Sequence, residues 1–230
     1  MKILGIDTSS AVASAAICDG DRLICETSLN NKLTHSQTIM PIIDGVFKMS
    51  ELKPADIDVF AVSVGPGSFT GLRIGVTTAK GLAHAVNKPV AGVNTLESMA
   101  YNLPFCGQII SPIMDARREQ VYNAFYTFEN GRIKELTPPR AISLEDCLEE
   151  LAQMGEDVIF LGDGVPVFRD RIAQRLGKQA SFAPQNLNMQ HAAAVCEAAK
   201  YKETVNYAQL VPMYLRKSQA EREREERGKK

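Results

Sequence analysis

Two polar turns in the first half of the sequence carry residue types that bind nucleotides in many proteins. Asp7-Thr8-Ser9 follows an apolar run, so its carboxylate could hold Mg²⁺ through water and its hydroxyls could contact a phosphate. Gly65-Pro66-Gly67 precedes a helix predicted over 71–86, whose free N–H groups and dipole would favour an anion. The candidate nucleotide-binding residues are Asp7, Thr8, Ser9, Gly65 and Gly67.

Neither turn is specific by itself. A capped turn also explains the first, a tight strand-to-helix turn explains the second, and the glycines lack the lysine of a Walker P-loop. The second-half counterpart, Asp115-Ala116-Arg117-Arg118-Glu119, suits a phosphate less well, because two long arginine side chains would fill the space that a backbone cradle needs. A surface ion-pair cluster with Glu119 or with a partner's carboxylate is the other interpretation of these arginines.

A helix predicted over 34–50 has a wide apolar face. At about 100° per residue its apolar side chains cover an arc of about 180°, whereas one buried face needs about 100°. Such a helix has two covered sides, one facing its own sheet and the other facing either a neighbouring helix or another protein chain. In the next predicted helix, Gly71, Gly75 and Ala79 form a stripe of small residues that permits close packing.

The elements that position these residues occur twice along the chain. An apolar run ending in Asp7, two further strands, a helix, and a strand leading into a glycine loop recur 108 residues later with Asp115 in place of Asp7. This order predicts an α/β fold with two mixed sheets flanked by helices. We expect a first lobe at 1–105, a second at 106–215 that a helix over 189–201 closes, and a charged tail at 216–230.

Composition excludes several classes of protein. The 230 residues are 45% apolar, which is enough for a sizeable core and excludes disordered and fibrous proteins. The 26 basic and 27 acidic side chains nearly cancel, so the whole-molecule field gives no sign of nucleic-acid or membrane-surface binding. Within that balance, 216–230 holds seven basic and four acidic side chains, whereas 1–215 holds 19 basic and 23 acidic. The sequence has no signal peptide and no membrane-spanning run, which predicts a cytoplasmic protein, and its five cysteines are expected to be buried free thiols.

Five segments, in this order, resemble the TsaB, or YeaZ, family of tRNA threonylcarbamoyladenosine biosynthesis proteins. They are Ile3–Ser9, His35-Ser36-Gln37, Gly65–Gly75, Asp115–Arg118 and Pro212–Arg216. The Gly-Pro-Gly segment is the most specific, while the Asp-Thr-Ser start indicates only the wider superfamily of actin-like and sugar-kinase-like (ASKHA, RNase H-like) folds. The resemblance covers nearly the whole chain up to Arg216 and implies the same duplicated α/β architecture.

The resemblance also implies a non-catalytic partner of the related catalytic subunit TsaD. Members of the family join TsaD and the ATPase TsaE in a complex that transfers a threonylcarbamoyl group, supplied as an adenylate by TsaC, onto N6 of adenosine 37 in tRNA. Pairing with TsaD runs through helices of the first half, tRNA is reached through the complex, and a homodimer is expected in isolation. The implied partner contacts are Ile39, Met40, Ile43, Val46, Phe47, Gly71, Arg73 and Gly75.

The sequence departs from the catalytic relative where that protein binds its metal. After a strand predicted over 89–93, the relative carries a His-x-x-x-His pair, and here Thr95 and Met99 stand at those two places. A hydroxyl and a thioether are poor ligands for a hard or borderline divalent ion. We therefore expect no metal, no catalytic residue and no required cofactor, with weak or interface-dependent binding of ATP or ADP left open. Two other classes remain: an active ASKHA-type phosphotransferase or hydrolase that uses Asp7, and a nucleic-acid-binding module that uses the basic tail.

Overall fold

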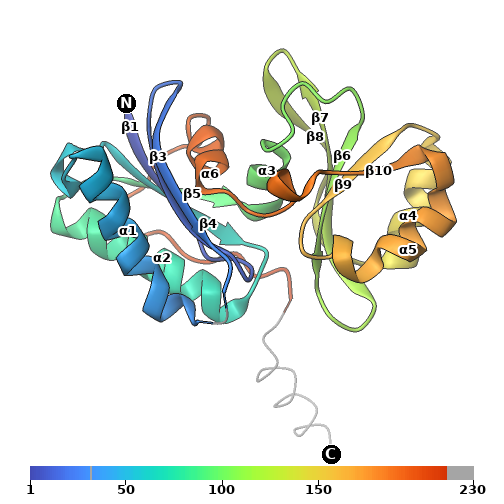
Figure 1. Cartoon of the computed structure of the whole chain (residues 1–230), viewed down its shortest axis with the longest axis horizontal. Helices are drawn as coiled ribbons and strands as arrows, with labels where there is room; N and C mark the ends of the chain where they lie inside the picture. The colour runs from blue at the N-terminus through green and yellow to red at the C-terminus, as the bar shows by residue number, and fades with distance from the viewer. Residues whose placement is uncertain (32, 217–230) are drawn as a thin grey trace, which may run out of the picture.

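Two five-stranded mixed sheets form the centre of the protein (Figure 1). The computed structural model describes residues 1–31 and 33–216. The first sheet has the order β3-β2-β1-β4-β5 and the second the order β10-β9-β6-β7-β8. The strands are β1 Lys2–Asp7, β2 Ala13–Asp19, β3 Arg22–Leu29, β4 Val59–Gly65, β5 Val90–Asn94, β6 Ile109–Asp115, β7 Gln120–Glu129, β8 Arg132–Ser143, β9 Val158–Leu161 and β10 Ala180–Phe182.

Helices separate and cover the sheets, so that five layers alternate between helix and sheet (Figure 1). In the first lobe one face of the sheet is covered by two long helices, and the outer face of the second sheet is covered by another pair. Two short helices lie between the sheets. The helices are α1 His35–Ser50, α2 Phe69–Ala85, α3 Thr95–Ala100, α4 Leu144–Met154, α5 Val165–Leu176 and α6 Ala192–Ala199, with 3-10 turns at Pro54–Asp56, Gly177–Gln179 and Gln185–Leu187.

Local sequence explains where most elements begin and end. The central strands β1 and β4 are almost continuously apolar because both of their faces are buried. The Asn130-Gly131 turn between β7 and β8 has φ of 51° and 76°, the left-handed conformation that tight hairpins require. Ser143 caps α4 by accepting a hydrogen bond from the Asp146 amide at 3.0 Å, and Gly155 ends that helix at φ 69°. The observed bounds of α1 and α2 lie within two residues of the helices predicted over 34–50 and 71–86, and β5 lies within one residue of the strand predicted over 89–93. Among the described residues, none of the helices combines the length and apolar character needed to cross a membrane.

The last helix was expected to close the second lobe, and this expectation is wrong. α6 packs on the first sheet, on the face opposite α1 and α2 (Figure 1). Val195 and Cys196 lie in one apolar cluster with Ile3 and Ala16. A Cβ on Gly5 would collide with the Ala192 carbonyl oxygen, so this glycine permits the close approach of helix and strand.

The C-terminal segment also returns to the first lobe. Val205 pairs with Val90 at the edge of β5, through amide-to-carbonyl distances of 2.9 and 3.0 Å. Leu210 joins the core beneath α1 and α2, and the Met213 amide donates to the Val64 carbonyl oxygen at 2.7 Å. The chain therefore crosses between the lobes twice, which the order of elements along the sequence does not reveal.

A partly buried ion pair fixes the start of α6. The Glu26 carboxylate on β3 lies 3.6 Å from His191 Nδ1 and accepts the Ala193 amide at 3.0 Å. Burial alone would raise the pKa of Glu26, but hydrogen bonds from His191 and the Ala193 amide outweigh it and lower that pKa. The same hydrogen bond to Glu26 raises the pKa of His191 against the effect of burial.

This pair should make stability depend on pH in a defined direction. The Glu26 contribution is present above its ordinary pKa of 4.5 and is lost as pH falls through the lowered folded value. The His191 contribution is complete below its ordinary pKa of 6.5 and is lost as pH rises through the raised folded value. We expect wild type to lose about 0.5–1 kcal/mol relative to His191→Gln between about pH 6 and pH 8, measured by urea denaturation. Equal pH dependence in the two proteins would contradict this role of the pair.

Candidate functional site

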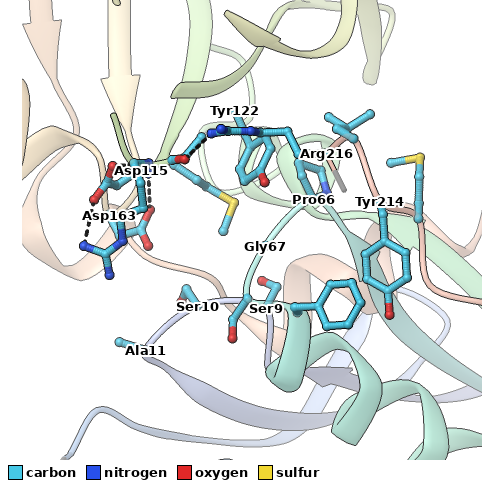
Figure 2. A pocket seen from close by; sticks show the side chains of 17 residues that line it. Ser9, Ser10, Ala11, Pro66, Gly67, Asp115, Tyr122, Asp163, Tyr214 and Arg216 are labelled. Atoms are coloured by element: carbon cyan, nitrogen blue, oxygen red, sulfur yellow. Dashed lines mark hydrogen bonds and ion pairs between the residues drawn. The ribbon is translucent and has the colours of Figure 1, made fainter. Parts of the chain in front are cut away.

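A cleft of about 530 Å³ lies between the two lobes, at the ends of β1 and β6 (Figure 2). The first lobe contributes Ser9, Ser10 and the glycine loop, and the second contributes the turn after β6. The C-terminal segment forms one side of the opening. The residues that line the cleft are Ser9, Ser10, Ala11, Pro66, Gly67, Ser68, Phe69, Met114, Asp115, Ala116, Arg117, Tyr122, Asp163, Met213, Tyr214, Leu215 and Arg216.

The Asp7 carboxylate is fully buried and does not line this cleft. One oxygen, Oδ1, accepts the Ser9 amide at 2.8 Å and the Ser9 hydroxyl at 2.7 Å. The other, Oδ2, accepts the hydroxyl of Ser63 on β4. Burial raises the pKa of Asp7, while these three hydrogen bonds act to lower it. The side chain therefore ties the ends of two neighbouring strands together, and the capped-turn alternative describes it better than a magnesium ligand does.

Thr8 and Gly65 also have structural roles. The Thr8 hydroxyl donates to the Gly71 carbonyl oxygen at 2.8 Å, and a Cβ on Gly71 or Gly75 would collide with Thr8. A Cβ on Gly65 would collide with the Met213 carbonyl oxygen of the C-terminal segment. The small-residue stripe of α2 thus permits close packing, as predicted, and the contact is with the turn after β1.

Ser9 and Gly67 are the two candidate residues that reach the cleft. Gly67 lies directly against Ser9, because a Cβ at this glycine would collide with the Ser9 carbonyl oxygen. The Ser68 amide donates to that same oxygen at 2.7 Å. The N-terminus of α2 still opens on this edge of the cleft, so the remaining anion-binding feature is the helix end beside Ser9.

The second-half turn adopts a conformation that its sequence does not suggest. Arg117, Arg118 and Glu119 are three consecutive non-glycine residues with positive φ, of 64°, 54° and 61°. The Arg117 side chain is 87% exposed and pairs with Asp115 at 3.4 Å. It therefore lies at the rim of the cleft, whereas the sequence predicted that it would fill the space for a phosphate. Glu119 pairs with Arg171 on α5, so Arg117 forms its surface ion pair with Asp115 and not with Glu119 as the alternative interpretation expected.

The arginine that crosses the cleft is Arg216, the first residue of the predicted tail. Its guanidinium donates to the Ala116 carbonyl oxygen of the second lobe (Figure 2). Two residues earlier, the Tyr214 ring stacks on Phe69 with centroids 4.3 Å apart. The segment thus bridges the cleft from the glycine loop to the second lobe. The rest of the predicted tail, 217–230, lies outside the described residues.

Asp163 is a second carboxylate at the cleft and was not singled out from the sequence. Burial raises its pKa to about 6 and the nearby charge of Asp115 adds to this, while the hydrogen bond from the Asp115 amide at 3.3 Å opposes it. A raised carboxylate pKa means that the folded state favours the protonated form. The ionised form therefore costs stability, and this cost is absent below the ordinary value of 3.8 and complete above about pH 6.

Asp163→Asn is therefore expected to stabilise the protein near pH 8 and to change little near pH 4. The asparagine oxygen can still accept the Asp115 amide, and the buried charge is removed. The expected gain is about 1–3 kcal/mol in the free energy of unfolding near pH 8, measured by denaturant titration at both pH values. If Asp163→Asn is less stable than wild type near pH 8, the conclusion that burial disfavours the ionised Asp163 carboxylate is contradicted.

The residues at the metal-ligand positions do not fit a divalent metal. Thr95 and Met99 lie on α3, and both are fully buried. The Met99 thioether lies 3.4 Å from the Gln190 side-chain nitrogen, and Gln190 in turn accepts the Ser10 hydroxyl at 2.6 Å. Within the described residues there is no group of three His, Cys, Asp or Glu side chains suited to a metal ion.

The predicted partner contacts fall into buried and exposed groups. On α1, Ile39, Ile43, Val46 and Phe47 are at most 8% exposed and belong to the first-lobe core. These four side chains pack on the sheet and on α2 within the same chain, so they offer little surface to a partner, although Ile39 reaches the floor of the groove described next. Gly71 and Gly75 are buried as well.

Met40 and Arg73 are exposed and flank a groove between α1 and α2. This groove, called the α1–α2 groove below, has a volume of about 550 Å³. Met40 is 47% exposed, and Ile39 contributes to the floor. The lining residues are Ser36, Ile39, Met40, Arg73, Ile74, Thr77, Thr78, Gly81 and Leu82.

Comparisons with known proteins agree with the duplicated architecture. Residues 24–224 match the family described as TsaD, tRNA N6-adenosine threonylcarbamoyltransferase. Two proteins named tRNA threonylcarbamoyladenosine biosynthesis protein TsaB are similar to the chain: that of Bacillus subtilis is 35% identical and that of Escherichia coli 29% identical, each over 96% of both chains. A solved structure described as an uncharacterized protein with similarity to peptidase YEAZ from Pseudomonas aeruginosa has a TM-score of 0.78 at 24% identity, covering 94% of this chain and 99% of its own. The chain belongs to the TsaB (YeaZ) family, relatives of TsaD that share the duplicated actin-like fold.

Proposed function

We propose that the protein is a non-catalytic subunit for the threonylcarbamoylation of tRNA adenosine 37, and that it binds and activates TsaD. The observation that carries this proposal is the burial and hydrogen bonding of the Asp7 carboxylate. A carboxylate at the end of the first strand serves nucleotide chemistry only if it faces the cleft, and here it is fully buried, lies outside the cleft lining and accepts hydrogen bonds from Ser9 and Ser63. The chain therefore retains the fold of the catalytic relative while this carboxylate stabilises the strand ends.

The α1–α2 groove supports the partner role. It combines the exposed Met40 with Ile74 and Leu82 on the walls and small residues on α2. Apolar surface of this kind is favourable to bury against another protein, and Thr77 and Gly81 allow a partner helix to approach closely. We propose that TsaD docks here, and that a second copy of the chain covers the same groove when TsaD is absent, giving a homodimer.

The remaining partners follow from that role. TsaE would join the complex formed with TsaD, TsaC would supply the adenylate, and tRNA would be reached through the complex in the cytoplasm. The cleft beside Ser9 and the start of α2 supports weak ATP or ADP binding at most, because Arg216 crosses it and the buried Asp7 does not line it. No cofactor is required in this proposal.

A phosphotransferase or hydrolase is the alternative, and one similar structure is described as peptidase-like. Such an enzyme needs an activated nucleophile or a metal. Burial raises the pKa of the Cys147 thiol to about 12 and also raises that of Cys196, which makes both poor nucleophiles. A nucleic-acid-binding module would depend on 217–230, which lies outside the described residues.

Light scattering with and without TsaD tests the partner role, and Mg-ATP turnover tests the alternative. We expect a homodimer alone, a mixed complex with TsaD, and no ATP hydrolysis above background by the purified chain. Hydrolysis that Asp7→Asn abolishes in a folded protein would overturn the non-catalytic role. Failure of the purified chain to form a complex with TsaD would overturn the partner role.

A further inference from the structure

A second groove lies on the other side of α2 from the α1–α2 groove. It runs between α2 and the C-terminal segment, has a volume of about 660 Å³, and is called the C-terminal groove below. Val76 and Lys80 contribute from α2, and Tyr207, Leu210 and Val211 contribute from the C-terminal segment. The two grooves share Arg73, Thr77 and Gly81, which form the ridge between them.

Both walls of this groove lack acidic residues. Neither the sequence of α2, 69–85, nor the segment 205–216 contains an aspartate or a glutamate. Arg73, Lys80 and His84 project into the groove from α2. The absence of acidic residues from these two segments is unusual for this chain, because residues 1–215 hold 23 acidic and only 19 basic side chains. The groove is therefore a local cationic surface on an acidic protein.

The two permanent cations are held in place by neutral groups. Lys80 Nζ donates to the carbonyl oxygens of Leu210 at 2.9 Å and Ala208 at 3.4 Å. Arg73 Nε donates to the Tyr214 hydroxyl at 3.1 Å, and its guanidinium lies 4.1 Å from the Phe69 ring centroid. None of the ion pairs between described residues involves Arg73 or Lys80. Their positions are fixed while their charges stay uncompensated, which suits recognition of an anionic group.

Apolar side chains stand beside these charges. Val211 is 68% exposed and Tyr214 is 40% exposed, and Leu210 lies at the floor, only 7% exposed. We propose that the C-terminal groove binds an acidic polypeptide segment that also carries apolar side chains. This contact borders the TsaD contact proposed for the α1–α2 groove along the ridge that they share, and Lys80, Leu210 and Val211 belong to the C-terminal groove alone. Carboxylates of the segment would meet Arg73 and Lys80, and its apolar side chains would cover Val211.

RNA is the other polyanion that a cationic groove could attract. Stable phosphate binding depends on several lysine or arginine contacts along the backbone, and this groove offers two beside an exposed valine and a half-buried proline. Apolar side chains of that kind are buried favourably by a polypeptide and gain little from a phosphate backbone. The composition of the groove therefore favours the acidic segment.

Fluorescence anisotropy with the purified full chain tests this site without TsaD. The probe is a fluorescein-labelled peptide of about 15 residues in which glutamate and leucine follow helical periodicity. Val211→Glu should weaken binding about 10-fold, because it places a carboxylate beside those of the peptide. Lys80→Gln, which keeps a donor for the backbone carbonyls, should weaken it about 3- to 5-fold. The matched control is Val167→Glu on α5, where the valine is 57% exposed and lies outside the groove.

Several results would overturn the proposal. They are no binding of the acidic peptide by wild type, equal losses in Val211→Glu and Val167→Glu, and equal binding of a peptide in which lysine replaces every glutamate. Tighter binding of a single-stranded oligouridylate that displaces the acidic peptide would assign the groove to RNA instead. Circular dichroism of each variant separates these outcomes from unfolding, and complex formation with TsaD is scored independently, so each proposal can fail alone.

Discussion

The substitution Met40→Glu is expected to weaken the complex with TsaD by about 100-fold or more, whereas Met49→Glu on the same helix should leave it intact. Met40 lines the α1–α2 groove at 47% exposure, so a partner that covers this groove must remove the new carboxylate from water. Burying an unpaired charge at an interface costs about 3 kcal/mol or more, which corresponds to the expected change in affinity.

Met49 makes a closely matched control. It is 63% exposed, belongs to α1 and lies outside the lining of the groove. Both variants should keep the far-UV circular dichroism spectrum of wild type, because neither side chain is buried in the monomer. Isothermal titration against TsaD measures the difference. Equal affinities for Met40→Glu and wild type, with both proteins folded, would remove the α1–α2 groove from the interface.

Ile43→Ala is expected to lower the free energy of unfolding by about 2–5 kcal/mol. Ile43 is 1% exposed and packs in the first-lobe core between α1 and the sheet, so truncation removes apolar contacts and leaves a cavity. Met49→Ala is the control and should change stability by less than about 0.5 kcal/mol, because that side chain is exposed. Urea denaturation of the chain alone measures both.

This second prediction separates the core from the interface. If Ile43 were an interface residue, as the sequence suggested, its truncation would spare the stability of the chain and weaken only the complex. A loss of stability below about 0.5 kcal/mol for Ile43→Ala would contradict its placement under the sheet.

The sequence predicted that α1 has two covered sides, but it could not identify what covers them. Helical periodicity gives the width of the apolar arc on α1 and says nothing about the distance to a neighbouring element. Ile39, Ile43 and Val46 pack against the sheet and against α2. Helix α2 lies close to the turn after β1, because Gly71 and Gly75 have no Cβ that would collide with Thr8. Two exposed methionines, Met40 and Met49, carry the part of the face that remains open, and of these Met40 lines the α1–α2 groove.

The placement of α6 shows a similar limit. The repeated order of strands predicted two lobes, and both sheets have the expected mixed topology. The sequence of α6 is almost entirely small and apolar, a pattern that fits either sheet. The choice depends on contacts between distant residues, such as Gly5 with Ala192 and Glu26 with His191, which no local pattern encodes.

The candidate site was predicted in part. The sequence identified the two turns that meet at the cleft, and Ser9 and Gly67 do line it. It did not reveal that Ser63 holds the Asp7 carboxylate, since these residues are 56 positions apart. The charge pattern assigns Arg216 to the tail, although it also ends the recognised segment Pro212–Arg216, whose Met213 and Tyr214 lie beside the glycine loop in the structure.

The most direct test of the non-catalytic role is tRNA threonylcarbamoylation reconstituted from TsaC, TsaD, TsaE and this protein. We predict full activity with Asp7→Asn that still binds TsaD, and loss of activity with Met40→Glu or when the chain is omitted. The modified nucleoside is measured by mass spectrometry of digested tRNA. Loss of activity in an Asp7→Asn protein that is folded and bound to TsaD would contradict the account, because it would make the buried carboxylate part of the chemistry.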